Sequence, residues 1–367
     1  MSKSLYGALA ALILAGCGGS SSDTPAPAPP AEEPPPAAET ATPEAETTAP
    51  PKHAALFGAL PDRMDTDANP ATPEKIALGR ILYFDERLSK NHDLSCNSCH
   101  QLDKFGVDGE PTSPGHKGQR GDRNSPTVYN AALHVAQFWD GREPDVEAQA
   151  KGPILNPVEM AMPDAETVVA VLKSIPGYAD LFTAAFPDAE DPITYDNLAL
   201  AIGAFERGLT TPAPFDRYVA GQADAISAEQ VAGLDTFVST GCTACHSGVG
   251  VGGGMYQKLG LVSPWPDLQD PGRGKVTGNE AENHFFKVPS LRNITKTGPY
   301  FHTGAVSDLG EAVRMMAKHQ LGKELSDDEV TSIVAFLDSL EGTVDAEYTA
   351  KPTLPESGPD TPKPDPT

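Results

Sequence analysis

The chain has 367 residues, and its 51 acidic and 27 basic residues give a formal net charge of −24 at pH 7. A surface this acidic repels nucleic acid, which argues against a nucleic-acid-binding protein, and it favours basic proteins as partners. The length leaves room for two domains of ordinary size once unfolded segments are set aside.

The first 17 residues, MSKSLYGALAALILAGC, predict a signal peptide that ends at Cys17. They contain one lysine, a short apolar run and a small-residue cleavage site, and the run is too short for a permanent transmembrane helix. The LAGC ending resembles a bacterial lipobox, whose cysteine becomes the lipidated N-terminus after cleavage. We therefore predict a periplasmic protein that is attached to a membrane by a lipid at Cys17. The alternative is an ordinary signal peptide in which the cysteine is coincidental.

Two further segments have the composition of unfolded chain. Residues 18–52 are rich in Pro, Ala and Glu, which predicts a disordered tether. Residues 344–367 are also rich in Pro, and they are predicted to form a second disordered tail. The folded part is expected to lie between these two segments.

Apolar residues recur with helical spacing in the folded part. Helices are expected over residues 72–89 and 193–209. Helix starts are predicted at Ser227, Ser307 and Ser326, and the first and third have a glutamine or glutamate three residues later that completes a capping box. Strand signals are sparse, so the fold is predicted to be mainly α, with long loops and little β structure.

The cysteines after Cys17 form two pairs, and a histidine follows each pair directly in the motifs CNSCH and CTACH. The motif residues are Cys96, Cys99 and His100, and Cys242, Cys245 and His246. Two thiols at this spacing can form thioethers with the vinyl groups of one haem, and the adjacent histidine then becomes the proximal iron ligand. A lone motif of this kind is also compatible with half of a zinc site or a redox dithiol. Because both pairs carry the histidine, we predict two covalently bound haems of the c type.

The two motifs lie far apart in the chain, so each haem can have a domain of its own. We predict two cytochrome c-like helical haem domains. The N-terminal domain is expected to span residues 53–215, and the C-terminal domain residues 216–343.

His116 lies in SPGHKGQRG, residues 113–121, a stretch with three glycines, one proline and no apolar residue. Such a segment buries too little surface to hold one conformation, so it is predicted to be a mobile loop. One interpretation of His116 is a solvated loop residue, and the other is a metal ligand that can leave. The nearby CNSCH motif favours the ligand, because a loop with few packing contacts is easily released.

Other side chains suit the chemistry of a haem enzyme. Glu159 lies in the apolar stretch KGPILNPVEMAMP, which should raise its pKa and suit it to proton transfer during cleavage of an O–O bond. A thioether ligand raises the potential of a haem. Met255, Met315 and Met316 all follow His246 in the chain. Met316 shares a helix face with apolar residues, whereas Met315 is expected to pack against neighbours or to face solvent.

Six motifs in this order, LSCNSCH, SPGHKGQRGDRNSPTVYN, FWDGR, NPVEM, TGPYFHTG and AVRMMAKHQLG, resemble those of the bacterial di-haem cytochrome c peroxidases. The resemblance runs from about residue 60 to about residue 342. It implies an enzyme that reduces hydrogen peroxide to water with electrons from a small cytochrome c or cupredoxin. The family also implies a homodimer. Within each chain, electrons are expected to reach the C-terminal haem first and then to pass to the N-terminal haem.

The resemblance implies roles for single residues. His116 matches the removable second ligand of the N-terminal haem, and Met316 matches the thioether ligand of the C-terminal haem. Trp139 matches a residue that lies between the two haems. Glu159 and Gln149 match the distal pocket of the N-terminal haem, whereas without the resemblance they would be read as a surface carboxylate and a solvated amide.

His302 matches a family histidine near the second haem, as a propionate partner rather than an iron ligand. The resemblance also implies a calcium ion between the domains, held by the side chain of Asn124 and the carbonyl oxygens of Thr297 and Pro299. No acidic calcium motif is visible in the sequence. The histidines expected to have ordinary structural roles are His53, His92, His134, His284 and His319.

Two other functions stay open. One is a lipid-anchored di-haem electron-transfer cytochrome, which needs both irons permanently six-coordinate and has no use for Glu159. The other is a related di-haem enzyme that oxidises a protein substrate. That relative has a tyrosine at the position of Met316, so the methionine favours the peroxidase.

Overall fold

The computed structural model describes residues 50–367. The predicted signal peptide over residues 1–17, with Cys17, lies outside the described residues, as does nearly all of the predicted tether over residues 18–52.

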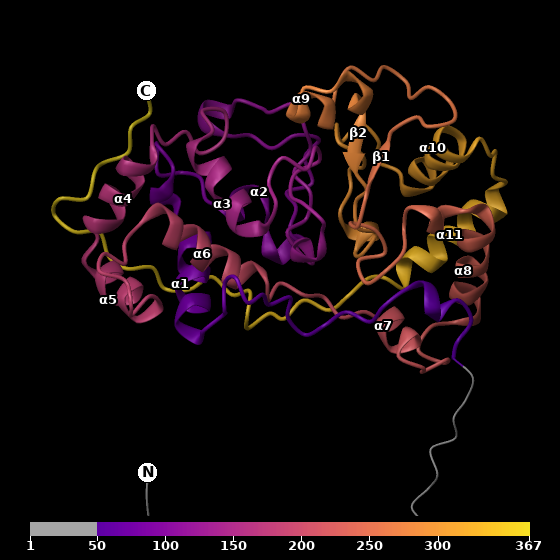
Figure 1. The fold of residues 1–367 in the computed structure, drawn as a ribbon, viewed down its shortest axis with the longest axis horizontal. Coiled ribbons are helices and arrows are strands. Elements are labelled where there is room, and N and C mark those ends of the chain that lie inside the picture. Colours follow the sequence, from indigo (N-terminus) through magenta and orange to yellow (C-terminus); the bar gives the residue numbers. More distant parts are fainter. Residues whose placement is uncertain (1–49) are drawn as a thin grey trace, which may run out of the picture. The chain divides into compact units, whose positions relative to one another are not determined.

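Helices make up most of the regular structure, which confirms the prediction of a mainly α fold (Figure 1). They are α1 (Pro73–Tyr83), α2 (Cys96–Cys99), α3 (Val146–Leu155), α4 (Ala165–Lys173), α5 (Pro176–Ala185), α6 (Tyr195–Glu206), α7 (Pro214–Val219), α8 (Ala228–Thr240), α9 (Arg273–Thr277), α10 (Leu309–Leu321) and α11 (Asp327–Asp338). The strands β1 (Tyr256–Lys258) and β2 (Phe285–Lys287) form one antiparallel pair. Within residues 50–367, no single helix has the length and apolar character needed to cross a membrane, and the one helix pair that meets these criteria jointly, α4 with α5, is bent by 106°.

The N-terminal core is built around α1 and α6. The Thr72 side chain caps the start of α1, and Leu78 and Leu82 are buried on its inner face. These leucines join a cluster of apolar side chains from α3, α4, α5 and α6. Gly79 lets α1 approach α6 closely, because a Cβ atom there would lie 1.9 Å from the carbonyl oxygen of Ala201.

The C-terminal core is built around α8 and α11, which pack against each other. Ser227 and Ser326 form the predicted capping boxes at the starts of these two helices. Helix α10 has Asp308 as its N-cap, not the predicted Ser307. The reason is that the Asp308 carboxylate accepts a hydrogen bond from the N–H three residues later.

The first described residues cross to the C-terminal core (Figure 1). Residues 50–60 lie against this core, and the ring centroids of Phe57 and Phe215 are 5.1 Å apart. The predicted N-terminal domain over residues 53–215 therefore differs from the structure at its start. Sequence patterns miss this arrangement because Phe57 packs against residues far along the chain.

Residues 344–367 cross in the other direction and run along the N-terminal domain, so the prediction of a disordered tail is wrong (Figure 1). Tyr348 stacks on Phe205 of α6 with ring centroids 5.2 Å apart, and its hydroxyl donates to the Phe205 carbonyl oxygen at 2.7 Å. Farther along, Arg87 donates to the carbonyl oxygen of Pro355 at 2.9 Å. The segment has neither helix nor strand, as its composition suggests. It is nevertheless held by side-chain packing and by hydrogen bonds to its carbonyl groups.

Candidate functional site

The first CxxCH motif presents its side chains to one large cavity. Helix α2 carries Cys96 and Cys99, and the Ser98 hydroxyl stabilises its start by accepting a hydrogen bond from the Ser95 N–H at 2.9 Å. His100 follows the helix directly. The two cysteines, both free thiols, and His100 line a cavity of about 1250 Å³.

The second CxxCH motif lines a separate and smaller cavity. Gly241, with φ of 102°, ends α8 in the left-handed region and turns the chain into the motif. Cys242, Cys245 and His246 line a cavity of about 230 Å³, together with Met316 from α10. Most of the remaining wall is apolar, and it comes from α10, from α11 and from the segments over residues 124–139 and 286–302.

Both motif histidines have the chemistry of haem ligands. The Nδ1 atoms of His100 and His246 are buried and have no hydrogen-bond partner within residues 50–367. Burial lowers the pKa of both rings, that of His246 to about 4, so the neutral imidazole prevails. Neutral imidazole is the form that binds iron, and two free thiols adjoin each ring. The donor set of each motif therefore fits a covalently attached haem.

His116 is buried, with only 5% of its surface exposed. Its N–H donates to the carbonyl oxygen of Glu159 at 2.8 Å, and its own carbonyl oxygen accepts from the Gln119 N–H at 3.1 Å. Gly115 packs so closely that a Cβ atom there would lie 2.0 Å from the Val158 carbonyl oxygen. The prediction of a loop with few contacts is therefore wrong at His116. Backbone hydrogen bonds hold this segment, and its lack of apolar residues gives no sign of them.

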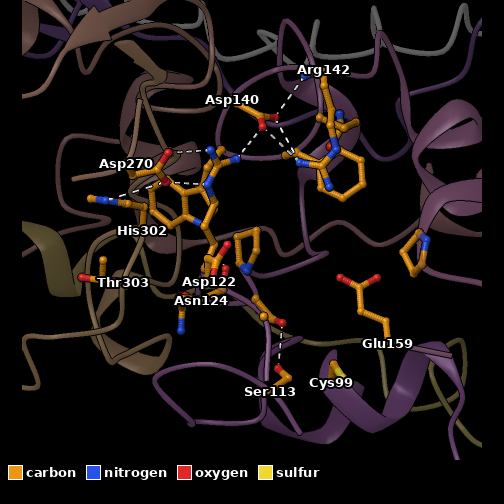
Figure 2. Close-up of a pocket in the computed structure, with 18 of the residues that line it drawn as sticks. Cys99, Ser113, Asp122, Asn124, Asp140, Arg142, Glu159, Asp270, His302 and Thr303 are labelled. Carbon is orange, nitrogen blue, oxygen red and sulfur yellow. Dashed lines mark hydrogen bonds and ion pairs between the residues drawn. The ribbon is translucent and has the colours of Figure 1, made fainter. Parts of the chain in front are cut away.

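Glu159 and Gln149 line the first cavity together with the CNSCH motif. Gln149 lies on α3, and Glu159 lies in the turn that follows this helix. Burial raises the pKa of Glu159, although the charge of Arg142 and a side-chain hydrogen bond with Asn156 act in the opposite direction. Figure 2 shows Glu159 and Cys99 on the same side of the cavity. A carboxyl group that titrates above its usual range therefore lies beside the first haem-attachment motif.

Trp139 and His302 line both cavities, so they lie where the two cavities adjoin. The Trp139 Nε1–H donates to the carbonyl oxygen of Asn124 at 2.9 Å, and its ring centroid is 6.4 Å from that of His302. The His302 ring stacks on Phe286 at 4.5 Å, and its Nε2 atom lies 4.0 Å from a carboxylate oxygen of Asp270. Burial lowers the pKa of His302.

The three residues predicted to bind calcium, Asn124, Thr297 and Pro299, all line the second cavity. The side-chain amide of Asn124 donates to the carbonyl oxygen of Glu110 at 3.0 Å. In the described part of the chain, no group of three or more His, Cys, Asp or Glu side chains is arranged to hold a metal ion. Calcium binding therefore stays a prediction.

The methionines of α10 line different cavities. Met316 lines the second cavity, and Met315 lines the first, where the sequence predicts packing or solvent exposure for it. Successive residues of an α-helix point about 100° apart, which allows one helix to reach both spaces. Met255 is not among the residues that line either cavity. The cavities therefore favour Met316 over Met255 as the thioether at the second site.

Sequence patterns do not indicate an ion-pair network at the first cavity. Arg123 pairs with Asp140 at 2.5 Å and with Asp270 at 2.7 Å. Arg142 also pairs with Asp140, at 3.1 Å. Figure 2 shows Asp140, Asp270 and Arg142 away from the side where Glu159 and Cys99 lie. Asp140 and Arg142 are neighbours in one loop, but Arg123 and Asp270 come from two other segments, so no local motif could reveal the whole network.

Two buried ionisable residues also line the cavities. Burial and the neighbouring Glu147 raise the pKa of Glu206 to about 8, and this residue lines the first cavity. Burial lowers the pKa of Lys287 to about 8, and this residue lines the second cavity. The one sequence signal for Glu206 is its place directly after the apolar run over residues 198–205, and the sequence gives no such signal for Lys287.

Comparisons with known proteins match both halves of the chain. The family model described as di-haem cytochrome c peroxidase matches residues 73–224, and the model described as cytochrome c matches residues 230–341. The chain is 46% identical over 319 residues to cytochrome c551 peroxidase of Pseudomonas aeruginosa, which covers 85% of this chain and 91% of that protein. It is 45% identical over 300 residues to cytochrome c551 peroxidase of Nitrosomonas europaea, which covers 81% of this chain and 88% of that protein.

A solved structure with a similar fold is that of a MauG-like protein associated with microbial copper homeostasis. Its TM-score is 0.70 and its sequence identity 27%, and the match covers 80% of this chain and 97% of that chain. The similarity therefore extends over most of the described residues.

Proposed function

Because the chain belongs to the di-haem cytochrome c peroxidase family, we propose that it reduces hydrogen peroxide to water with electrons from a small redox protein. Its two cytochrome c-type domains imply two covalently bound haems c. In this proposal, electrons reach the C-terminal site first and then pass to the N-terminal site. The observation that carries it is the first cavity, where a haem-attachment motif, Glu159 and Gln149 share one space.

When bound, the haems supply the redox chemistry and an iron that peroxide can reach. The residues proposed to hold them are Cys96, Cys99, His100 and the removable His116 at the first site, and Cys242, Cys245, His246 and Met316 at the second. His302 is proposed to contact a propionate group at the second site. These assignments follow the family resemblance, and the lining of the two cavities supports those of the motif residues, Met316 and His302.

Glu159 is proposed to move protons in the first cavity. Because burial raises its pKa, its carboxylate can accept a proton and return it at a pH closer to neutrality than an exposed glutamate could. The Gln149 side chain has N–H groups that suit it to donate a hydrogen bond to the oxygen atom that leaves with negative charge. Cleavage of the O–O bond needs both of these contributions.

Release of His116 is proposed to be linked to Glu159. The His116 N–H donates to the Glu159 carbonyl oxygen, so the loop over residues 113–121 cannot move away without breaking this bond. A loop movement that frees the histidine therefore also frees the backbone of the proton-transferring residue.

The partners follow from charge and from the family. The net charge of −24 favours a basic electron donor, and we propose a small cytochrome c or a cupredoxin.

Trp139, which lines both cavities, is proposed to lie on the path between the two haems. Calcium binding by Asn124, Thr297 and Pro299 and a homodimer are proposed from the resemblance. The LAGC motif supports a periplasmic protein with a lipid anchor at Cys17.

A di-haem enzyme that oxidises a protein substrate is a second candidate, because similar structures include a MauG-like protein. The presence of Met316 in the second cavity favours the peroxidase, since a thioether suits a site that receives electrons from a donor. A di-haem electron carrier is a third candidate. It would give no role to a carboxyl group with a raised pKa beside the first motif.

Steady-state reduction of peroxide by a reduced small cytochrome c tests the proposal. We expect turnover by the wild-type protein and a kcat about 10²–10⁴-fold lower for Glu159→Gln, which cannot accept a proton. Glu166→Gln, on the exposed side of α4, is the matched control and should keep wild-type turnover. A wild-type protein that accepts electrons but does not reduce peroxide would refute the peroxidase and favour the carrier.

A further inference from the structure

Lys287 is a lysine buried beside the second haem-attachment motif. It ends β2, where its backbone N–H donates to the carbonyl oxygen of Trp139 at 2.8 Å. Only 5% of its surface is exposed, and it lines the second cavity with His246. Lysine is rarely buried unless its charge has a partner.

Among the described residues, the one polar contact of the Lys287 side chain is with a histidine. Its Nζ atom lies 3.0 Å from the Nδ1 atom of His134, which also lines the second cavity. Within residues 50–367, Lys287 forms no ion pair with a carboxylate. Since an ammonium group can only donate, Nδ1 of His134 accepts and the ring proton lies on Nε2.

The position of His134 is fixed by packing. A Cβ atom at Gly253 would lie 2.4 Å from the His134 ring, so the ring lies directly against this glycine. The Val135 N–H donates to the Gly253 carbonyl oxygen at 2.8 Å, which holds the two segments together. His134 therefore directs one N–H of the Lys287 ammonium, and two N–H groups remain for another acceptor.

A buried ammonium that contacts only a neutral ring is unfavourable unless an anion accompanies it. The second CxxCH motif lines this cavity, which predicts that a haem is attached there. The anionic groups of a haem are its propionates. We propose that Lys287, positioned by His134, binds a propionate carboxylate of the second haem. His302 is not the source of this positive charge, because burial lowers its pKa, and the opposing effect of nearby Asp270 does not offset burial.

The consequence is an electrostatic contribution to the potential of the second haem. A fixed positive charge beside the haem favours the reduced iron, which carries one positive charge less than the oxidised iron. This inference rests on haem attachment at the second site, but it does not depend on peroxide reduction. Potentials are measured without peroxide, so either claim can fail alone.

The test is a spectroelectrochemical titration at pH 7 of the purified holoprotein and its variants. Lys287→Met should lower the midpoint potential of the second haem by at least 59 mV. For one electron, this shift corresponds to a tenfold change in the reduction equilibrium. Lys287→Arg keeps the charge and should stay within threefold of wild type. Lys258→Met, an exposed lysine of the paired strand β1, is the matched control and should change nothing.

Haem content by pyridine haemochrome is measured for every variant. Two haems with an unchanged potential in Lys287→Met would overturn the proposal. If Lys287→Met attaches only one haem, Lys287→Gln takes its place in the titration, under the same criterion. If both neutral variants lose the second haem, retention of two haems by Lys287→Arg supports the proposal, and loss in this variant as well overturns it.

Discussion

Glu206 is a carboxyl group buried at the end of α6, with 6% of its surface exposed. Its neighbour Glu147 takes both carboxylate hydrogen bonds of Arg207, each at 2.8 Å, so this guanidinium already has its partner. Burial and repulsion by Glu147 raise the pKa of Glu206 to about 8. Glu206 is therefore protonated in the folded protein at neutral pH.

Glu206→Gln should increase the free energy of unfolding at neutral pH. Between pH 4.5, the ordinary value for glutamate, and about 8, the folded wild type binds a proton at Glu206 that the unfolded chain has lost. The stability of the wild type therefore falls as pH rises through this window. Glutamine does not titrate, so the variant does not lose this stability of about 1.4 kcal/mol per pH unit. Denaturant unfolding at pH 5 and pH 7 measures the free energy of unfolding of both proteins. The difference between the variant and the wild type should be larger at pH 7 than at pH 5, by up to about 3 kcal/mol.

The control for this prediction is Glu190→Gln, an exposed glutamate that precedes α6. Its effect on the free energy of unfolding should be small and the same at both pH values. An equal effect of Glu206→Gln at pH 5 and pH 7 would contradict the prediction, because a group without a raised pKa has no pH-dependent effect in this range.

At the scale of single residues, the sequence could predict the groups that a local motif defines. Cys96 and His100 are such groups, because haem attachment needs them at a fixed spacing. Glu206 and Lys287 could not be predicted, because their burial arises from packing between segments that are distant in the chain. Only the structure shows that each lines a haem-attachment cavity.

At the scale of elements, the helices were predictable because their caps and apolar periodicity are local. The capping boxes at Ser227 and Ser326 illustrate this. The loop over residues 113–121 was less predictable, since the His116 N–H and the Gln119 side chain tie it by hydrogen bonds to the distant turn that carries Glu159. Glycine content predicts conformational freedom, but Gly115 serves close packing instead.

Gly115→Ala should loosen the loop that carries His116. Its Cβ atom would lie 2.0 Å from the Val158 carbonyl oxygen, so the loop must move away from the turn before Glu159. If His116 is the removable ligand, the oxidised variant should have less of the six-coordinate low-spin form and more activity without prior reduction. His116→Gly should show the full effect. Optical and EPR spectra of the oxidised proteins measure the change.

Gly121→Ala is the matched control for the loop. An alanine Cβ at this position meets no atom within 4 Å, so its spectrum and activity should match those of the wild type. A wild-type spectrum for His116→Gly would show that this histidine is not the ligand. If His116→Gly has the effect but Gly115→Ala does not, the contact with Val158 is not what holds the loop.

At the scale of the whole described chain, both ends cross to the other domain (Figure 1). Composition predicted the lack of regular structure in residues 344–367 but not their attachment to α6 through Tyr348. The domain boundaries were predicted from the positions of the two motifs, and motif positions contain no information about where the chain ends pack. The crossing therefore follows from tertiary contacts alone.

The two cavities adjoin at Trp139 and His302, so the two haems are expected to be neighbours. The proposed entry of electrons at the second haem requires that the two haems differ in midpoint potential. Met316 should provide it, because sulfur favours ferrous iron more than imidazole does. Met316→His should keep the second haem six-coordinate and lower its midpoint potential. A donor of fixed potential would then reduce the protein poorly, and turnover should collapse although Glu159 and Gln149 are unchanged. A redox titration paired with turnover measures both effects.

Met315→Leu is the control for this prediction, because Met315 lines the other cavity and leucine has a similar volume. It should leave the higher of the two potentials unchanged. An unchanged higher potential in Met316→His would show that another residue, with Met255 the next to test, holds the iron. A lowered potential with full turnover would mean instead that electrons do not enter through the C-terminal haem. That result would keep the thioether assignment and reverse the proposed direction of electron flow, because the donor would then have to reach the N-terminal haem directly.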